Sequence, residues 1–240
     1  MATLRVAWLL LLAVPAWGGM ECGDGVSLCG VLTLESGYGS GNYEHPEPVV
    51  HGLWPETDSY GDSKCKEPGD MSDPDIIYPC YQQRGEDDAD LLSFEIHEWE
   101  KHGWCAGVED AEGFFTQVCS MSDAPLLVMN TTRQNGGDLD AMSDALTAAG
   151  YSIYSTDSEN SQVELSACAK PGGKWVLAAV EDFSALCGGW DDDDDDDGSD
   201  TVDSCEPNTH GPPCSEDSDC TSYMDCLRCA GSGYCTDVPL

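Results

Sequence analysis

Fourteen cysteines constrain this chain of 240 residues more than any other feature of its sequence. The number is even and far above cytosolic usage, so we expect the cysteines to pair as disulfides in an oxidising compartment. Six of them lie between Cys205 and Cys235, in a stretch with almost no large aliphatic residues. A segment of that composition cannot fold by hydrophobic burial alone, so disulfides must hold it together.

The N-terminus agrees with this compartment. Arg5 precedes the apolar run VAWLLLLAV, and the small residues Ala16 and Gly18 follow at the spacing of a cleavage site. Because the run is shorter than the roughly 20 residues that cross a bilayer, we predict a secretory signal peptide over residues 1–18 rather than a membrane anchor. The mature protein is expected outside the cell or in a lysosome or vacuole, with Asn130 of the sequon NTT glycosylated.

Composition divides the mature chain into three parts. The apolar segments lie within residues 19–190, which we expect to form one packed domain. Seven consecutive aspartates open residues 191–204, predicted to be a solvated linker. The run also copies the opening of a calcium loop, but Ser204 stands where the bidentate glutamate should fall. Residues 205–240 form a cysteine-rich module, in which CLRC has a zinc-like spacing although three disulfides are favoured.

The charge of the chain limits how it can bind nucleic acid. It carries 46 acidic and 9 basic side chains, a net charge of -37. This balance excludes a broad basic surface that binds nucleic acid by releasing counterions. A phosphate polymer would therefore have to be bound locally, by a few cationic residues.

The stretch SFEIHEWEKHGWC, Ser93 to Cys105, contains two of the five histidines and a lysine. Its residues favour a helix from about Asp90 to His102, ended by Gly103. The helical period directs Ile96 and Trp99 toward the core and places an acid, a cation and two imidazoles on one face: His97, Glu98, Lys101 and His102. Glu98 precedes His102 by one turn, so its carboxylate is expected to raise the pKa of that imidazole.

Taken alone, this face is more typical of a solvated helix with Glu/Lys pairs than of a functional site. A second segment changes the interpretation. VVHGLWPE, Val49 to Glu56, is typical of a buried strand that ends at His51 and continues into a turn. Two histidines from separate elements, with a lysine and a glutamate, are the groups needed to cleave a phosphodiester without a metal ion.

HGLWPE and HEWEKHGWC resemble the two active-site segments of the ribonuclease T2 family, the secreted, acid, largely base-nonspecific ribonucleases. VELSACAKPGGKWVLAAVEDFSALC is similar to the family's C-terminal strands, so the resemblance covers about residues 29–190. It implies an α+β fold with a central antiparallel β-sheet packed with helices, and single-stranded RNA as the substrate. It implies no cofactor and no metal.

The resemblance also implies roles for the proton carriers. His51 would protonate the leaving 5′-oxygen, and His102 would remove the proton of the ribose 2′-hydroxyl, giving a 2′,3′-cyclic phosphate. The sequence alone does not decide which histidine is the acid and which the base. Glu98 and Lys101 would polarise the phosphate and stabilise the transition state, and His97 would help to hold the phosphate.

Four further residues are implied in base binding. Trp54 and Phe94 would stack on bases, and Glu56 and Tyr60 would line the first base site. Stacking tolerates any base, so low specificity is expected.

The chain departs from the family pattern at two places. Trp104 stands where the family usually has threonine, and this ring could narrow substrate access or add a stacking surface. Leu34 and Ser36 take the places of polar and aromatic residues common on the family's first strand, so the resemblance assigns no second base pocket here. Neither change touches a proton carrier.

The family pattern implies the disulfides Cys65–Cys105 and Cys168–Cys187. The remaining cysteines of residues 19–190 allow three pairings, of which we favour the one that contains Cys29–Cys119; they are Cys22, Cys29, Cys80 and Cys119.

The tail segment CSEDSDCTSYMDCLRCAGSGYC is similar to squash-type cystine-knot inhibitors. Its first loop, EPNTHGPP, lacks the lysine or arginine that a trypsin inhibitor presents. We therefore expect a knottin-like module that protects the chain or binds a protein or carbohydrate partner, on a monomeric enzyme. The alternative function is a catalytically idle storage or interaction protein, against which the intact set of proton carriers and phosphate contacts argues.

Overall fold

The computed structural model describes residues 19–189 and the pairs 228–229 and 235–236. The chain divides into two compact units, residues 1–191 and 192–240. In the second unit the described residues form two short antiparallel strands, β6 (Arg228–Cys229) and β7 (Cys235–Thr236). The expected signal peptide, the acidic linker with its calcium-loop alternative, and the rest of the expected knot lie outside the described residues.

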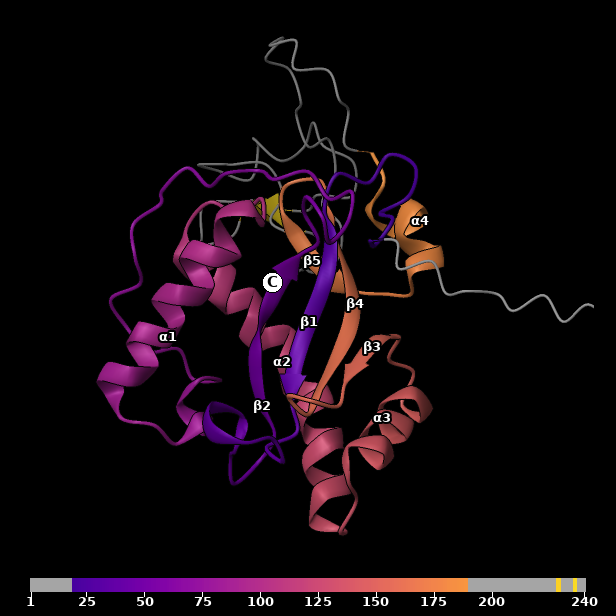
Figure 1. The fold of residues 1–240 in the computed structure, drawn as a ribbon. Coiled ribbons are helices and arrows are strands. Elements are labelled where there is room, and N and C mark those ends of the chain that lie inside the picture. The colour runs from indigo at the N-terminus through magenta and orange to yellow at the C-terminus, as the bar shows by residue number, and fades with distance from the viewer. Residues whose placement is uncertain (1–18, 190–227, 230–234, 237–240) are drawn as a thin grey trace, which may run out of the picture. The chain divides into compact units, whose positions relative to one another are not determined.

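A five-stranded antiparallel sheet forms the centre of the first unit (Figure 1). Its strand order is β2-β1-β4-β3, and β5 pairs with β4. The strands are β1 (Cys29–Glu35), β2 (Val49–Pro55), β3 (Ile153–Asp157), β4 (Gln162–Lys170) and β5 (Lys174–Leu177). β1 is buried along its whole length, because it lies between β2 and β4 and is covered by helix α2 (Ala111–Gln134).

The helices of the first unit pack around this sheet, and α2 crosses β1, β2 and β5 (Figure 1). The α-helices are α1 (Asp88–Lys101), α2 (Ala111–Gln134), α3 (Leu139–Ala148) and α4 (Phe183–Cys187). Short 3-10 turns are η1 (Gly41–Tyr43), η2 (Gln82–Arg84), η3 (Gly103–Cys105) and η4 (Val180–Asp182). The predicted α+β class with a central antiparallel sheet is therefore confirmed. Among the described residues, no helix has the length and apolar character needed to span a bilayer.

Three aspartates begin the long helices. The side chain of Asp87 accepts hydrogen bonds from two backbone N–H groups of α1, and Asp110 and Asp138 each accept one from α2 and α3. Such N-caps satisfy donors that have no partner within the helix and contribute about 1 kcal/mol each. Part of the acidic excess of this chain thus stabilises helix ends.

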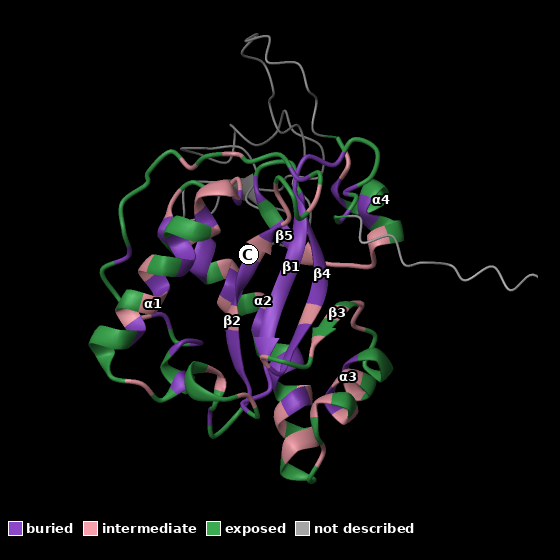
Figure 2. Cartoon of the chain, viewed as in Figure 1, coloured by how far each residue is buried: buried purple, intermediate pink, exposed green. Residues whose placement is uncertain are grey.

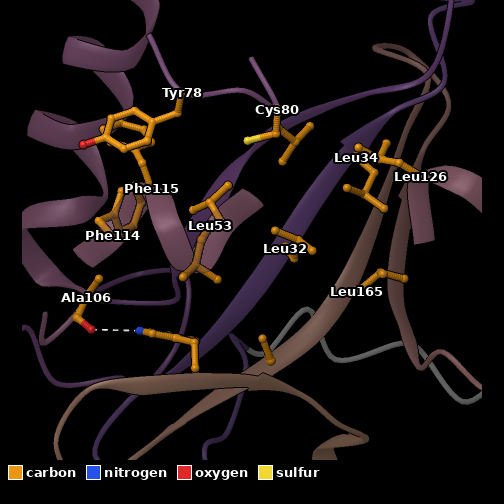
Figure 3. Close-up of a cluster of buried hydrophobic side chains, with 14 of the residues drawn as sticks. Leu32, Leu34, Leu53, Tyr78, Cys80, Ala106, Phe114, Phe115, Leu126 and Leu165 are labelled. Atoms are coloured by element: carbon orange, nitrogen blue, oxygen red, sulfur yellow. Dashed lines mark hydrogen bonds between the residues drawn. The ribbon is translucent and has the colours of Figure 1, made fainter. Parts of the chain in front are cut away.

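The hydrophobic core lies between the sheet and its helices. Figure 2 shows the buried residues concentrated along the strands and on the helix faces turned toward them. Figure 3 shows Leu32 and Leu53 of the sheet beside Phe114 and Phe115 of α2, and all four are fully buried. Each such side chain contributes about 1.5–3 kcal/mol relative to an exposed one. This core fixes the relative positions of β2 and α1, which carry the predicted site.

Two disulfides implied by the family resemblance are confirmed. Cys65 is joined to Cys105, which anchors the turn η3 to the segment after β2. Cys168 is joined to Cys187, which anchors α4 to β4.

The other four cysteines of this unit form the bridges Cys22–Cys29 and Cys80–Cys119, so the favoured pairing of Cys29 with Cys119 was wrong. The backbone gives the reason. Cys29 is the first residue of β1 and packs in one cluster with Met20 and Cys22 of the N-terminal segment, and only seven positions separate it from Cys22. Cys119 lies on α2, where its neighbour is the segment that leads into α1.

Candidate active site

His51 is the extra residue of a β-bulge in β2. In the pairing of β1 with β2, Thr33 lies opposite Gly52 and Leu34 lies opposite Val50, so His51 has no partner of its own. A bulge bends its strand and re-aims the side chain of the inserted residue. The strand was expected to end at His51 but continues to Pro55. The imidazole is thus held by a strand on both sides, with 13% of its side chain exposed.

Helix α1 carries the second predicted segment. It spans Asp88–Lys101, close to the predicted range, and Gly103 begins a 3-10 turn instead of capping the helix. A side chain at Gly103 would place its Cβ only 2.1 Å from the Trp99 ring, so this turn requires glycine.

The polar face of α1 is not uniformly solvated. Glu98 is 1% exposed, as buried as the core residue Trp99 beside it. Lys101 and His97 are exposed, and His102 is half-buried at the end of the helix. The interpretation as an ordinary solvated face therefore fails at Glu98, whose carboxylate must have partners inside the protein.

Those partners come from β2. The Nε2 atom of His51 lies 3.4 Å from Oε1 of Glu98, and the indole N–H of Trp54 donates a hydrogen bond to Oε2 at 3.0 Å. The Trp54 ring also stacks on His102, with 5.1 Å between ring centroids. Gly52 permits this approach, since a Cβ there would lie 2.1 Å from Oε2 of Glu98. The structure thus brings His51 and Trp54 to the carboxylate of Glu98, and the Trp54 ring in turn contacts both His51 and His102.

Glu35, at the end of β1, is absent from the predicted site residues. It is fully buried, and its Oε1 lies 2.8 Å from Nδ1 of His51. The same carboxylate is 2.6 Å from Nε2 of His45 and accepts a hydrogen bond from Arg84 at 3.0 Å. The signal that could have identified it is its place as the one acidic residue at the end of an apolar strand. A carboxylate buried there needs basic partners, so it indicates a polar cluster inside the protein.

These contacts set the charge of His51. Burial by itself would lower the pKa of His51, but the hydrogen bonds to Glu35 and Glu98 outweigh it and raise the pKa to about 9. Burial likewise favours the neutral form of Glu35, whereas hydrogen bonds from His45 and His51 and the charge of Arg84 lower its pKa to about 2. The pKa of Glu98 is also lowered, because the contacts with His51 outweigh its burial.

His102 behaves in the opposite way. Its burial is the largest influence and lowers its pKa to about 4. The carboxylate of Glu98 opposes this shift, as expected from the one-turn spacing, but the positive charges of His51, Lys101 and His97 add to it. The expectation of a raised pKa was therefore wrong. The result is a charged and a neutral imidazole in one site over a wide pH range.

The remaining predicted residues lie around this centre. Phe94 of α1 lies with its ring centroid 5.2 Å from that of His51, and the Arg84 guanidinium lies 4.0 Å from the Phe94 centroid on its ring face. Phe94 and His97 line an open groove of about 780 Å³ that extends to Asp90 and η1.

On the other side, Glu56 and Tyr60 follow the end of β2. Burial, together with the charge of Glu164, raises the pKa of Glu56 to about 7. Tyr60 is 71% exposed, so its ring is open to solvent. Trp104, considered above as a ring beside the substrate, is half-buried and packs against the hydrophobic core.

One group of potential metal ligands occurs in the described residues: Cys22, Cys29 and Asp62. The two cysteines form a disulfide, so they provide no thiolate for a metal ion. The carboxylates of Glu35 and Glu98 are occupied by cationic or N–H donors of the protein.

Comparisons with known proteins identify the family to which this chain belongs. The model of the Ribonuclease T2 family matches residues 9–135, more than half of the chain. No curated protein matches the chain. Among solved structures, it is similar to Actibind, described as a T2 ribonuclease and antitumorigenic agent, with 20% identity, 66% of this chain and 83% of that chain covered, and a TM-score of 0.41. It is also similar to Japanese pear S3-RNase, with 16% identity, coverage of 63% and 90%, and a TM-score of 0.37. Because the family match covers more than half of the chain and includes the whole of β2 and α1, we conclude that the chain belongs to the ribonuclease T2 family.

Proposed function

We propose that this protein is an endoribonuclease that cleaves single-stranded RNA with low base specificity and without a metal ion, leaving 2′,3′-cyclic phosphate ends. Membership of the family supports endoribonuclease activity in general. The observation that carries the finer proposal is the pair of imidazoles that flank the Trp54 ring, with centroids 4.9 Å and 5.1 Å from it. One, His51, has a pKa of about 9, and the other, His102, has a pKa of about 4. Acid-base cleavage requires one protonated and one neutral group together.

The opposed pKa values assign the two roles in the proposal. His102, neutral above pH 4, accepts the proton of the 2′-hydroxyl as the 2′-oxygen attacks phosphorus. The bond from phosphorus to the 5′-oxygen breaks, and His51 donates its proton to the leaving oxygen. When the cyclic phosphate leaves as the product, proton exchange with water returns both imidazoles to their starting states. Slower hydrolysis of the cyclic phosphate, with the two roles reversed, would have the same result.

Cations and a fixed carboxylate serve the phosphate in this proposal. Lys101 and His97 are exposed near His102, so they are available to an incoming phosphate. Glu98 is held by His51 and Trp54 and does not need to reorganise as charge develops. Because the chain has a net charge of -37, this local cluster would provide most of the attraction for RNA.

The base contacts are also part of the proposal. The groove lined by Phe94 and His97 offers one stacking surface, and the exposed ring of Tyr60 beyond β2 offers another. Glu56 would face the first base, and its raised pKa lets it donate a hydrogen bond in mildly acidic solution. Trp54 would offer at most one face for stacking, because the other face of its ring lies on His102.

We further propose that the protein is secreted or delivered to a lysosome or vacuole and acts as a monomer. The predicted signal peptide and the disulfides of the first unit support an oxidising route. Asn130 lies in the last turns of α2, and its side chain accepts a hydrogen bond from Gln134. Its glycosylation stays a prediction. The cysteine-rich module would bind a partner or protect the chain.

The test is incubation of the mature protein with single-stranded RNA in EDTA, followed by analysis of the new 3′ ends. We expect cleavage with 2′,3′-cyclic phosphate ends, unaffected by the chelator. Catalytically inactive protein, under conditions in which its disulfides are intact, would instead support the idle storage or interaction protein. Cleavage that requires a divalent ion would contradict the metal-free mechanism.

A further inference from the structure

The buried carboxylate of Glu35 is surrounded by three basic side chains from three parts of the chain. His45 follows η1, His51 lies in β2, and Arg84 ends η2. Each of them lies within 3.0 Å of a carboxylate oxygen of Glu35. Removing a carboxylate from water is costly, so such a group persists only where its partners hold it ionised.

We propose that Glu35 is a positioning residue that keeps His51 protonated and directs its Nε2–H into the active site. The inference rests on the proposed function, since it concerns the general acid of that reaction. Glu35 itself does not contact the reacting atoms in this account. It acts through Nδ1, on the side of the ring away from Glu98.

The geometry requires a proton on Nδ1. At 2.8 Å from Oε1 of Glu35, an unprotonated Nδ1 would place its lone pair against a carboxylate lone pair. With the proton in place, the same distance is that of a charge-assisted hydrogen bond. The side-chain nitrogen of Gln162 also lies 2.8 Å from Nδ1. A half-turn of the Gln162 amide presents its oxygen to the ring instead and removes that conflict.

Glu35 is itself held rigidly. It pairs across the sheet with Val49 and with Gln162, so the backbone is fixed on both sides. Arg84 donates to Val50 O at 3.2 Å as well as to the carboxylate, and its guanidinium packs on Phe94. His45 is fixed by a contact of 3.2 Å between its Nδ1 and the carbonyl of Arg84. This support allows one orientation of the carboxylate.

The other groups around His51 do not replace Glu35. From α1, Glu98 faces Nε2, and the ring of His102 lies beyond Trp54. From η1, the Tyr43 ring lies with its centroid 6.0 Å away. Gln162 of β4 is uncharged, and the positive charge of Arg84 disfavours the imidazolium. Without Glu35, the one carboxylate described against this ring is Glu98, which also approaches at the longer distance.

The experiment compares full-length wild type with Glu35→Gln by nitrogen NMR titration of the His51 ring and by kcat/KM against pH on a dinucleotide. We expect the His51 pKa and the alkaline limb of the rate profile to fall together by about 1–3 pH units in Glu35→Gln. The acid limb, set by His102, should stay where it is. The matched control is Glu95→Gln, because Glu95 is equally buried but its described hydrogen bond is to the Tyr78 N–H. It should move neither limb.

If Glu35 has a merely structural role, Glu35→Gln will lower the maximal kcat/KM but leave both limbs of the pH profile at their wild-type positions. That result would overturn the inference. If Glu35→Gln does not fold, the wild type alone decides: a neutral His51 ring at pH 7.5, or a proton absent from Nδ1, would overturn it. The NMR arm needs no turnover, so inactivity of the wild type toward RNA would sink the proposed function without deciding this one. If the wild type cleaves RNA but the alkaline limb of Glu35→Gln is unmoved, the proposed function stands and the inference about Glu35 is wrong.

Discussion

Trp54 and Glu98 join the strand β2 to the helix α1 inside the site through one hydrogen bond of 3.0 Å from the indole N–H to Oε2. The carboxylate it holds is the one that faces His51, and the same indole lies on His102. Trp54, expected to stack on a base, is thus already engaged with two members of the site. Its main contribution in this structure is to fix the geometry of the proton carriers.

Trp54→Phe tests that contribution. Phenylalanine keeps an aromatic face but cannot donate to Glu98, so we expect kcat to fall about tenfold with little change in KM, in line with the loss of a hydrogen bond to a charged group. Steady-state kinetics on a dinucleotide gives both constants. A variant with unchanged kcat and a raised KM would mean that Trp54 serves base binding instead.

Gly52 is required for the approach of Glu98 to β2. In Gly52→Ala the new Cβ would meet the buried carboxylate of Glu98, which could move only by giving up its contacts with His51 and Trp54. We therefore expect a loss of about 1–3 kcal/mol in the free energy of unfolding and a lower kcat. Gly113→Ala is the control, because its Cβ would meet only Asp110 Oδ1, at 3.3 Å, in a helix that favours alanine. Thermal unfolding should separate the two. Equal stability of both variants would show that β2 and α1 can move apart freely.

The dependence of kcat/KM on pH follows from the two histidines. Below pH about 4 the proposed base His102 becomes protonated and the rate should fall. Above pH about 9 the proposed acid His51 loses its proton and the rate should fall again. Between the two limbs a dinucleotide should be cleaved at a nearly constant rate. A single limb, or two limbs less than about 2 pH units apart, would contradict opposed pKa shifts.

Polymeric RNA should behave differently from the dinucleotide. The net charge of -37 repels phosphates, and protonation of carboxylates in mildly acidic solution weakens that repulsion. We therefore expect an acidic optimum for the polymer that shifts upward when salt screens the surface charge. Identical profiles for both substrates, unmoved by salt, would show that the acidic surface does not govern substrate approach.

Local sequence patterns predicted much of this site. The α+β class, the helix that carries Glu98, and two disulfides of the first unit followed from motifs and their resemblance to a family. The helix depends on one short segment, in which spacing and residue type are sufficient. The fold class and the two disulfides, which join residues 40 and 19 positions apart, were implied by the resemblance alone. The resemblance implied that His51, Glu98 and His102 lie in one site. The structure supports this, because strand β2 and helix α1 bring the three residues close together.

Features that depend on long-range register could not be predicted in the same way. The bulge at His51 arises from the pairing of β1 with β2, and the partners of Glu35 come from positions 10, 16 and 49 residues away in sequence. The pKa of His102 is set by burial, whereas the sequence shows only the neighbouring charge of Glu98. The pairing of Cys29 likewise depends on which segments the sheet brings together.

Deletion of residues 191–240 should leave RNA cleavage essentially unchanged. Every proposed proton carrier and phosphate contact precedes Asp191, and residues 1–191 form a compact unit. The measurement is kcat/KM on a short oligonucleotide, with the four disulfides of the first unit verified. Loss of activity in a correctly bridged deletion protein would show that the cysteine-rich module contributes to the site.

The central claim is that His51 is the general acid and His102 the general base. On ordinary RNA, His51→Ala and His102→Ala should each lower kcat by about 100-fold or more. The decisive measurement repeats this with a dinucleotide whose bridging 5′-oxygen is replaced by sulfur, because a thiolate, with a pKa of about 8.5 for its thiol, leaves without needing a proton. We predict that His51→Ala then cleaves within about tenfold of wild type while His102→Ala remains about 100-fold slower. Rescue of His102→Ala instead of His51→Ala, or of neither variant, would contradict the account.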